Sequence, residues 1–206
     1  MRISKLTPSK RGQDRWILQL EDGSFLQVGK NQMADFALYD GRELTEEELE
    51  DLRRAERHDR FQSYALRVLM DTPMSRKKLV EHLCRKACPE EEAQAIAQRM
   101  VELGVLNEGW YAAEVARQYA SRGYGPRRVR DELYRRGVPR EHWDAALQEV
   151  EDWEEGMDAF LRKRLGGTAP DPKDLKRASD ALARRGYGWG EINAALRRYG
   201  AEIEEE

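Results

Sequence analysis

The 206-residue sequence has little of what disulfide-rich, metal-binding or membrane-spanning proteins need. Cys84 and Cys88 are its two cysteines, and their four-residue spacing on one helix side is awkward for a disulfide, so we expect both to be reduced and to fill small packing positions. Three histidines are present, and none completes a four-ligand zinc pattern. No apolar run approaches the roughly 20 residues that span a bilayer, and the first residues lack the apolar core of a signal peptide. We therefore expect a soluble, cytoplasmic protein with no metal, no cofactor and no membrane contact.

Recognisable catalytic patterns are also missing. The segments 123–125 and 186–190 are glycine-rich, but a phosphate-binding loop follows a strand in a βαβ unit, and helical patterns flank both segments here. Gly123, Gly137 and Gly186 instead fit helix ends in the left-handed conformation. No Gly-x-Ser-x-Gly elbow occurs, and no histidine stands in a recognised pattern with a nucleophile. The sequence therefore predicts no catalytic residue and no enzyme.

Charge is what the sequence has in excess. Charged residues make up 36% of the chain, yet the formal net charge is only −3. That total hides segregation, because the stretch 43–51 carries six acids whereas 122–140 carries seven arginines and two acids. Hydrophobic residues still make up 40%, which is enough for real cores. The surplus charge therefore belongs on solvated helix faces, and its local distribution is informative where the total is not.

The N-terminal residues predict a small β region. Apolar and polar residues alternate over 16–20, Asp22-Gly23 follows as a turn, and 24–28 resumes as a strand, which is the signature of a hairpin. Residues 3–6 can add a third strand. An isolated hairpin is marginal in water, so this region should pack against the next helix. Between the hairpin and that helix we expect a connector over 29–44.

Helical patterns dominate the remainder of the chain. Thr45 and Glu48 form a capping box at the start of a linking helix, and beyond residue 57 apolar residues recur at three- and four-residue spacings. The helices group in threes, so the predicted fold is mainly α: an elongated tandem array of three three-helix repeats with a small N-terminal β-hairpin region and a capping helix. The predicted parts are the β-hairpin region and connector (1–44), the linking helix (45–57), three-helix repeats over 58–106, 107–152 and 153–200, and an acidic tail (201–206).

The repeat rests on matched residues as well as on periodicity. Arg135-Arg136-Gly137 precedes Arg184-Arg185-Gly186 by 49 residues, and a shift of 50 relates the first repeat to the second. Each unit is too small to bury its faces alone, so neighbouring units should stack. Helix starts are predicted from Ser75 as a cap, from Pro89 and Pro126 in first turns, and from Asp171 as a cap before Pro172, after a glycine-proline linker at 166–172.

An arginine cluster with interleaved tyrosines is the best candidate for contacting phosphate or an acidic protein. Asp131 precedes Arg135 by four residues and Glu132 precedes Arg136 by four, an order that favours intrahelical ion pairs. Part of the cluster can therefore neutralise itself. The candidate partner-binding residues are Arg122, Tyr124, Arg127, Arg128, Arg130, Arg135, Arg136 and Arg140.

Four tryptophans stand at or near apolar positions of the helical pattern. We expect Trp110, Trp143, Trp153 and Trp189 to lie in cores or in the seams between units. Exposure of one of them would instead indicate a contact surface.

The order of several short motifs resembles that of the RecX regulatory proteins, over nearly the whole chain. The resemblance departs at Glu108-Gly109-Trp110 and in the linker that follows Gly166. The motifs are Gly41-Arg42-Glu43-Leu44-Thr45-Glu46-Glu47-Glu48, Tyr64-Ala65-Leu66-Arg67-Val68-Leu69, Ser75 to Leu79 with Leu83, Leu103-Gly104-Val105-Leu106-Asn107-Glu108 with Tyr111-Ala112, and Gly125, Leu133 and Arg136-Gly137-Val138.

The resemblance implies a regulator of the RecA recombinase in recombination and the SOS response. Such a protein lies along the groove of the RecA filament on single-stranded DNA and restrains ATP hydrolysis, strand exchange and coprotease activity. We expect a monomer whose helix 126–136 faces the filament, with acidic segments 43–51 and 149–155 adding charge complementarity. Two alternatives remain open: a helix-turn-helix-like nucleic-acid-binding protein that contacts DNA directly, and a structural adaptor for another helical partner.

Overall fold

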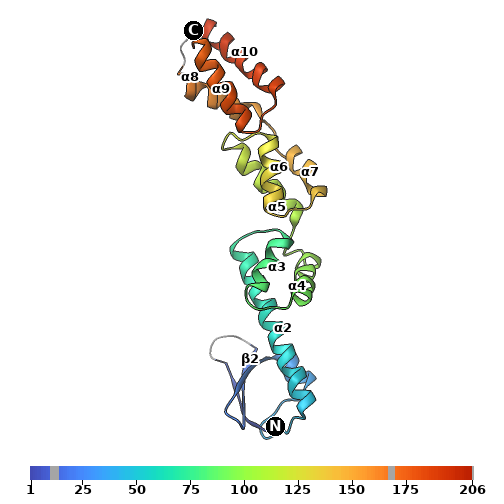
Figure 1. Ribbon diagram of the computed structural model, residues 1–206. Helices are drawn as coiled ribbons and strands as arrows, with labels where there is room; N and C mark the ends of the chain where they lie inside the picture. The colour runs from blue at the N-terminus through green and yellow to red at the C-terminus, as the bar shows by residue number, and fades with distance from the viewer. Residues whose placement is uncertain (10–13, 167–169, 206) are drawn as a thin grey trace.

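The molecule is an elongated row of small helical units that begins with a β-sheet module. The computed structural model describes residues 1–9, 14–166 and 170–205. The chain proceeds along the row from one end to the other, so its two termini lie far apart (Figure 1). Within the described ranges, none of the helices combines the length and the apolar character needed to cross a membrane.

The N-terminal module contains the predicted hairpin and its third strand. Strands β1 (Ile3–Pro8), β2 (Arg15–Leu20) and β3 (Phe25–Gly29) form an antiparallel sheet in the order β1-β2-β3. The connector differs from the expectation, because a short helix, α1 (Lys30–Asp35), occupies part of it. Six residues are too few to give a helical apolar period. The buried core of the module consists of Ile3, Leu18, Leu20, Val28, Leu38, Leu44, Leu49 and Leu52.

Helix α2 (Glu46–Asp71) joins this module to the helical units without a break. The capping box is confirmed: Thr45 Oγ1 accepts from Glu48 N at 3.1 Å, and Glu48 Oε2 accepts from Thr45 N at 2.9 Å. The helix end expected at residue 57 does not exist, because nothing between 57 and 60 stops a helix. What changes there is the buried face. Leu49 and Leu52 pack in the sheet module, whereas Phe61 and Ala65 pack in the first helical unit.

Loss of the capping box should weaken the start of α2. We expect Thr45→Ala to lower the free energy of unfolding by about 1 kcal/mol. The substitution removes the hydroxyl that accepts from Glu48 N, and it weakens the reciprocal bond from residue 45 N to the Glu48 carboxylate. Urea unfolding measures the difference. Thr72→Ala is the matched control, since Thr72 is exposed at the other end of the same helix and its side chain makes no hydrogen bond to the described residues. Equal effects of the two substitutions would contradict the prediction.

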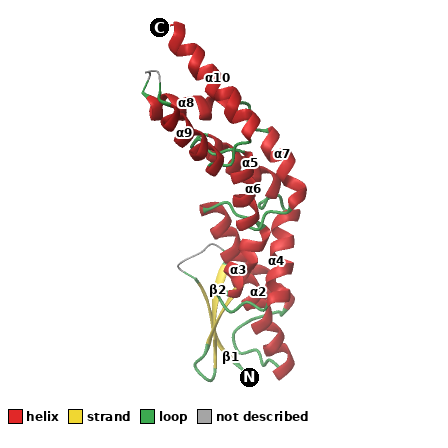
Figure 2. Cartoon of the chain, turned by 45° about the horizontal axis from the view of Figure 1, so that its top comes forward, coloured by secondary structure: helices red, strands yellow, loops and turns green. Residues whose placement is uncertain are grey.

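Three helical units follow one another (Figure 2). Each has its own buried cluster of side chains. The mainly helical repeat fold predicted from the sequence is thus confirmed. The third helix of unit 2 is irregular, since it begins as a 3-10 turn. Unit 1 comprises the C-terminal part of α2, α3 (Arg76–Cys84) and α4 (Glu90–Glu102); unit 2 comprises α5 (Glu108–Ala120), α6 (Pro126–Arg135), η1 (Arg140–His142) and α7 (Trp143–Gln148); unit 3 comprises α8 (Glu154–Leu165), α9 (Pro172–Arg184) and α10 (Trp189–Glu205).

Most local signals lie where the sequence predicted them. Gly123, Gly137 and Gly186 have φ values of +73°, +73° and +95°. Ser75 and Asp171 cap their helices, and Pro126 and Pro172 open theirs. Pro89 differs by one position, since it is the residue before α4. The linker residues 167–169 lie outside the described residues.

Two further expectations need correction. Cys88 is buried in the cluster of unit 1, but Cys84 is exposed, so only one of the two thiols fills a packing position. The segment expected as an acidic tail over 201–206 instead continues α10 as far as Glu205. Its glutamates and alanine are good helix formers, and no glycine or proline follows Gly200 to stop the helix.

Candidate partner-binding surface

The helix that carries most of the candidate arginines, α6, lies between its counterparts in the neighbouring units (Figure 1). The start of α3 meets the end of α6, where the Ser75 hydroxyl donates to the carbonyl of Arg136 at 2.6 Å. The start of α6 meets the end of α9, where Gly125 N donates to the carbonyl of Arg185 at 2.8 Å and Arg127 N to that of Gly186 at 3.2 Å. The same joint is therefore built twice.

The joints explain the sequence register found within the chain. Residues 75 and 125 differ by the first repeat shift of 50, and residues 136 and 185 differ by the second shift of 49. Space at both joints is tight: a Cβ on Gly137 would lie 2.7 Å from Cδ of Lys77, and one on Gly125 would lie 2.7 Å from the carbonyl carbon of Gly186. Gly125 is required because the backbones of adjacent units nearly touch there, whereas Gly137 is favoured by its positive φ and by the Lys77 side chain packed against it.

The joints also account for the basic first turns of α3 and α6, neither of which contains an acid. Cations near a helix N-terminus are normally unfavourable, because the helix dipole is positive there. Here the negative C-terminal end of the next unit's helix faces the same turn. The carbonyl groups at that C-terminal end offset the unfavourable interaction, so basic side chains are tolerated in these first turns.

At the other end of α6, two of the predicted arginines are neutralised by one buried carboxylate. Glu132 is 4% exposed. Its Oε1 accepts from Arg135 Nη2 and from Arg136 Nε, each at 2.6 Å, and its Oε2 accepts from Arg135 Nε at 2.9 Å. Burial by itself raises the pKa of this carboxyl, but the bonds from Arg135 and Arg136 outweigh it and lower the pKa from 4.5 to about 2. The expected Glu132–Arg136 pair is confirmed, whereas Arg135 pairs with Glu132 and not with Asp131.

Arg136 and its counterpart Arg185 brace their units through aromatic rings. Arg136 Nη1 donates to the Tyr111 hydroxyl at 3.0 Å, and its guanidinium lies over that ring. Arg185 lies over Phe160, 4.5 Å from the ring centroid, and donates to the carbonyl oxygens of Arg122 and Gly123. These two arginines stabilise the fold and are poorly available to a partner.

The remaining candidates differ in whether their side chains are held by contacts within the fold. Arg130 lies 3.4 Å from Asp144, Arg140 lies over Trp143, and Tyr124 packs against Tyr119 and under Arg185. The candidate arginines that neither form an ion pair nor lie over a ring among the described residues are Arg122, Arg127 and Arg128, which are all exposed.

These three residues, here called the free-arginine face, border the joint between units 2 and 3. The Arg122 carbonyl accepts from Arg185, and a Cβ on Gly186 would lie 2.8 Å from that of Arg128. The structure thus divides the predicted cluster between the two ends of α6. One end is neutralised and the other is available to a partner.

The tryptophans only partly follow the prediction. Trp143 and Trp153 pack against the buried cluster of unit 2, and Trp143 Nε1 donates to the carbonyl of Val138 at 3.0 Å. Trp110 and Trp189 are instead 51% and 57% exposed. Trp110 lines a hollow at the junction of units 1 and 2 together with Pro73, which the sequence pattern did not indicate.

The two acidic segments expected to assist the arginines lie far from each other along the row. The stretch 43–51 belongs to the sheet module and the start of α2. Within 149–155, four acids line a hollow of about 700 Å³ between α5 and α8. Among the described residues, no group of three histidine, cysteine or acidic side chains could hold a metal ion.

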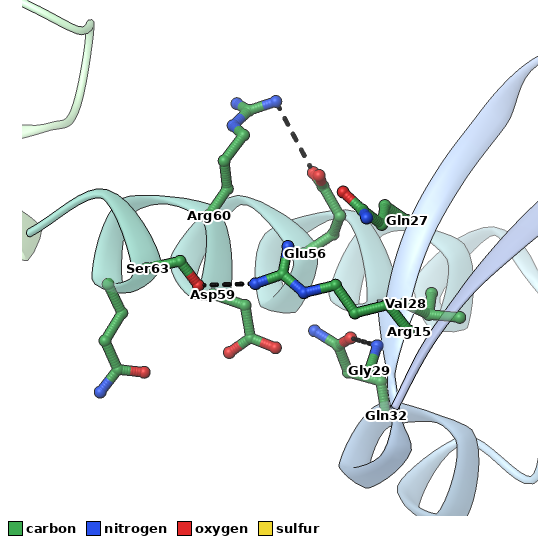
Figure 3. Close-up of a pocket in the computed structure, with 10 residues that line it drawn as sticks. Arg15, Gln27, Val28, Gly29, Gln32, Glu56, Asp59, Arg60 and Ser63 are labelled. Carbon is green, nitrogen blue, oxygen red and sulfur yellow. Dashed lines mark hydrogen bonds and ion pairs between the residues drawn. The ribbon is translucent and has the colours of Figure 1, made fainter. Parts of the chain in front are cut away.

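A small polar pocket lies where the sheet module meets α2 (Figure 3). Its volume of about 120 Å³ is far below that of typical ligand pockets. Arg15 Nη2 donates to Ser63 Oγ at 2.9 Å, and Gly29 N donates to Gln32 Oε1 at 2.6 Å (Figure 3). These contacts connect β2 to α2 and fix the start of α1, so the pocket is part of the structural junction.

Known proteins similar to this chain share both its sequence and its architecture. The family profile described as RecX, second three-helix domain, matches residues 107–147, which fall in unit 2. Regulatory protein RecX of Stenotrophomonas maltophilia (strain R551-3) is 36% identical over 135 residues, and that of Xanthomonas axonopodis pv. citri (strain 306) is 37% identical over 135 residues. Each alignment covers 65% of this chain and 83% of the relative.

Two solved structures show the same fold. A crystal structure of regulatory protein RecX superposes with a TM-score of 0.77 at 22% identity and covers 95% of this chain and 98% of that chain. The crystal structure of RecX from Lactobacillus salivarius gives a TM-score of 0.64 at 18% identity and covers 71% of this chain and 99% of that chain. With relatives 36% identical over most of their length, the chain belongs to the RecX family of regulatory proteins.

Proposed function

We propose that this protein binds the RecA filament on single-stranded DNA and restrains its ATP hydrolysis, strand exchange and coprotease activity. The family is one of regulatory proteins, and its relatives carry the name RecX. The observation that carries the proposal is the free-arginine face: three exposed cations without ion pairs among the described residues, beside the joint between units 2 and 3 of an elongated array. Such a face suits contact with a large anionic partner.

The form of the molecule supports a regulator in preference to an enzyme. A row of stacked units offers a long surface on which several weak contacts add by avidity. The acidic segment 43–51 lies in the sheet module and at the start of α2, and 149–155 lies beside the joint between units 2 and 3. Both can orient the protein on a partner with both signs of charge. The protein acts as a cytoplasmic monomer in this proposal.

Direct binding to nucleic acid is the second candidate. The basic first turn of α6 within a three-helix unit favours it, because helix-turn-helix proteins present such a helix to DNA. The net charge of −3 and the four acids of 149–155 beside the same joint oppose it. The two candidates differ in whether binding requires the nucleoprotein filament, since a DNA-binding protein needs no RecA.

The test is RecA ATPase on single-stranded DNA at increasing concentrations of this protein. We expect the native chain to inhibit, and Arg127→Glu to raise the half-inhibitory concentration about tenfold, because a charge at the contact becomes repulsive. Arg130→Glu should have a smaller effect, since Arg130 already faces Asp144. Arg57→Glu is the matched control, an exposed cation of α2 that forms no ion pair with the described residues.

Each outcome has a separate meaning. A native chain that leaves ATP hydrolysis unchanged at every ratio would refute the proposal. Inhibition by folded Arg127→Glu at native strength would preserve the regulator but remove the free-arginine face from the contact. Equal binding to bare single-stranded DNA and to the filament would favour the second candidate.

A further inference from the structure

Four positions are basic in all three units, and at one of them no side chain forms an ion pair or lies over a ring among the described residues. The repeat shifts relate Lys77 in α3 to Arg127 in α6 and to Lys176 in α9. All three residues are exposed, and none forms an ion pair with a described residue. They are called the phased cations below. No ion pair within the described parts of the chain accounts for this recurrence, which points to a partner outside the chain.

The other three recurring basic positions have contacts within the chain. Lys78 binds Glu81, Arg177 binds Asp174 and Arg135 binds Glu132. Lys86, Arg136 and Arg185 are related by the same shifts, and each lies over an aromatic ring of its own unit. The rings are those of Tyr64, Tyr111 and Phe160 respectively. Packing within the unit accounts for this position, which separates it from the phased cations.

An acid follows each phased cation after four residues. Glu81, Asp131 and Asp180 occupy this position in units 1, 2 and 3. None of them pairs with its phased cation: Glu81 binds Lys78 at 2.6 Å, and the other two form no ion pair with described residues. Each unit therefore presents a cation and, one helical turn on, an anion on its middle helix.

The joints repeat this arrangement along the row. The start of α3 lies on the end of α6, and the start of α6 lies on the end of α9, through equivalent residues. The three middle helices consequently follow one another along the array (Figure 1). The pattern of charge recurs once per unit, at an interval set by the contacts at these joints.

We infer that the phased cations form a three-point docking surface for a protein polymer that presents one carboxylate site per subunit. Each helical unit meets one such site. A nucleic-acid backbone is a poorer match, because phosphates spaced evenly along it would meet Glu81, Asp131 and Asp180 as well as the cations. A protein surface can place a carboxylate and a basic group side by side to suit both. The inference rests on the proposed function, in which the polymer is the RecA filament.

The experiment compares alanine substitutions at the three positions, singly, in pairs and together. The readouts are inhibition of RecA ATPase and binding to fluorescent single-stranded DNA with and without RecA. We expect Lys77→Ala, Arg127→Ala and Lys176→Ala each to raise the half-inhibitory concentration about fivefold, and the triple variant to raise it about 100-fold, since independent contacts multiply. Control substitutions are Arg57→Ala, Lys163→Ala and Arg197→Ala, exposed cations away from the middle helices.

Helix content and urea unfolding of the triple variant should match the native chain, because the replaced side chains are exposed. Native-strength inhibition by the triple variant would overturn the inference while leaving the proposed function intact. A parallel loss of affinity for bare single-stranded DNA would also overturn it, in favour of a nucleic-acid surface. No inhibition by the native chain would refute the proposed function itself.

Discussion

Gly125→Ala is expected to separate units 2 and 3 and to lower the free energy of unfolding by about 3 kcal/mol. The backbone of Gly125 has φ −87° and ψ 174°, which alanine adopts without strain. The effect must come from contact, since the new Cβ would lie 2.7 Å from the carbonyl carbon and oxygen of Gly186. Backbone atoms cannot move aside as a flexible side chain can, so the joint has to open.

Spin labels in units 1 and 3 measure the opening. The exposed Cys84 and an introduced Lys163→Cys provide the two sites. Burial raises the pKa of the Cys88 thiol to about 11, which keeps that thiol largely unreactive near neutral pH. We expect the distance distribution to broaden in Gly125→Ala. Gly190→Ala is the control, because a Cβ there meets no atom within 4 Å. An unchanged distance distribution in Gly125→Ala would contradict the prediction that the joint opens.

Removing the carboxylate of Glu132 is the second change with a large expected effect. Glu132→Gln should lower the free energy of unfolding at pH 7 by about 3 kcal/mol. This is the free energy that corresponds to the lowering of the Glu132 pKa from 4.5 to about 2 on folding. The substitution keeps the size of the side chain but removes the charge that binds Arg135 and Arg136. Asp131→Asn is the control, an exposed neighbour without an ion pair among the described residues.

The same carboxylate predicts a pH dependence. Because the pKa of Glu132 is lower in the folded chain than in the unfolded chain, its contribution is fully present above about pH 5 and is lost as the pH falls towards 2. Urea unfolding of the native chain and of Glu132→Gln across this range measures the difference. The two curves should converge in acid; parallel curves would show that Glu132 does not carry the contribution.

The repeat architecture could be predicted because it rests on local chemistry. Left-handed glycines such as Gly137 and Gly186, and caps such as Ser75 and Asp171, are determined by residues close in sequence. The continuity of α2 could not be predicted in this way. Its buried face changes from the sheet module to unit 1, and a change of face resembles a break when only periodicity is read.

The residues of the candidate surface could be predicted from the sequence, but which of them are neutralised within the fold could not. Arg135 has acidic neighbours at three and four positions before it, and only packing determines that the buried Glu132 is the one it binds. Arg185 bonds carbonyls of the preceding unit, a contact across some 60 residues that no local pattern contains. The exposure of Trp110 likewise depends on how units 1 and 2 meet. Long-range contacts therefore decide which members of a predicted cluster remain available.

Helix α2 has a mechanical consequence for the whole molecule. Its 26 residues span about 39 Å as one rod, with one end packed in the sheet module and the other in unit 1. Those two parts therefore turn together as a single stiff lever. Any bending that fits the protein to a curved partner must occur farther along, at the glycine-lined joints, which makes the C-terminal half the adjustable part.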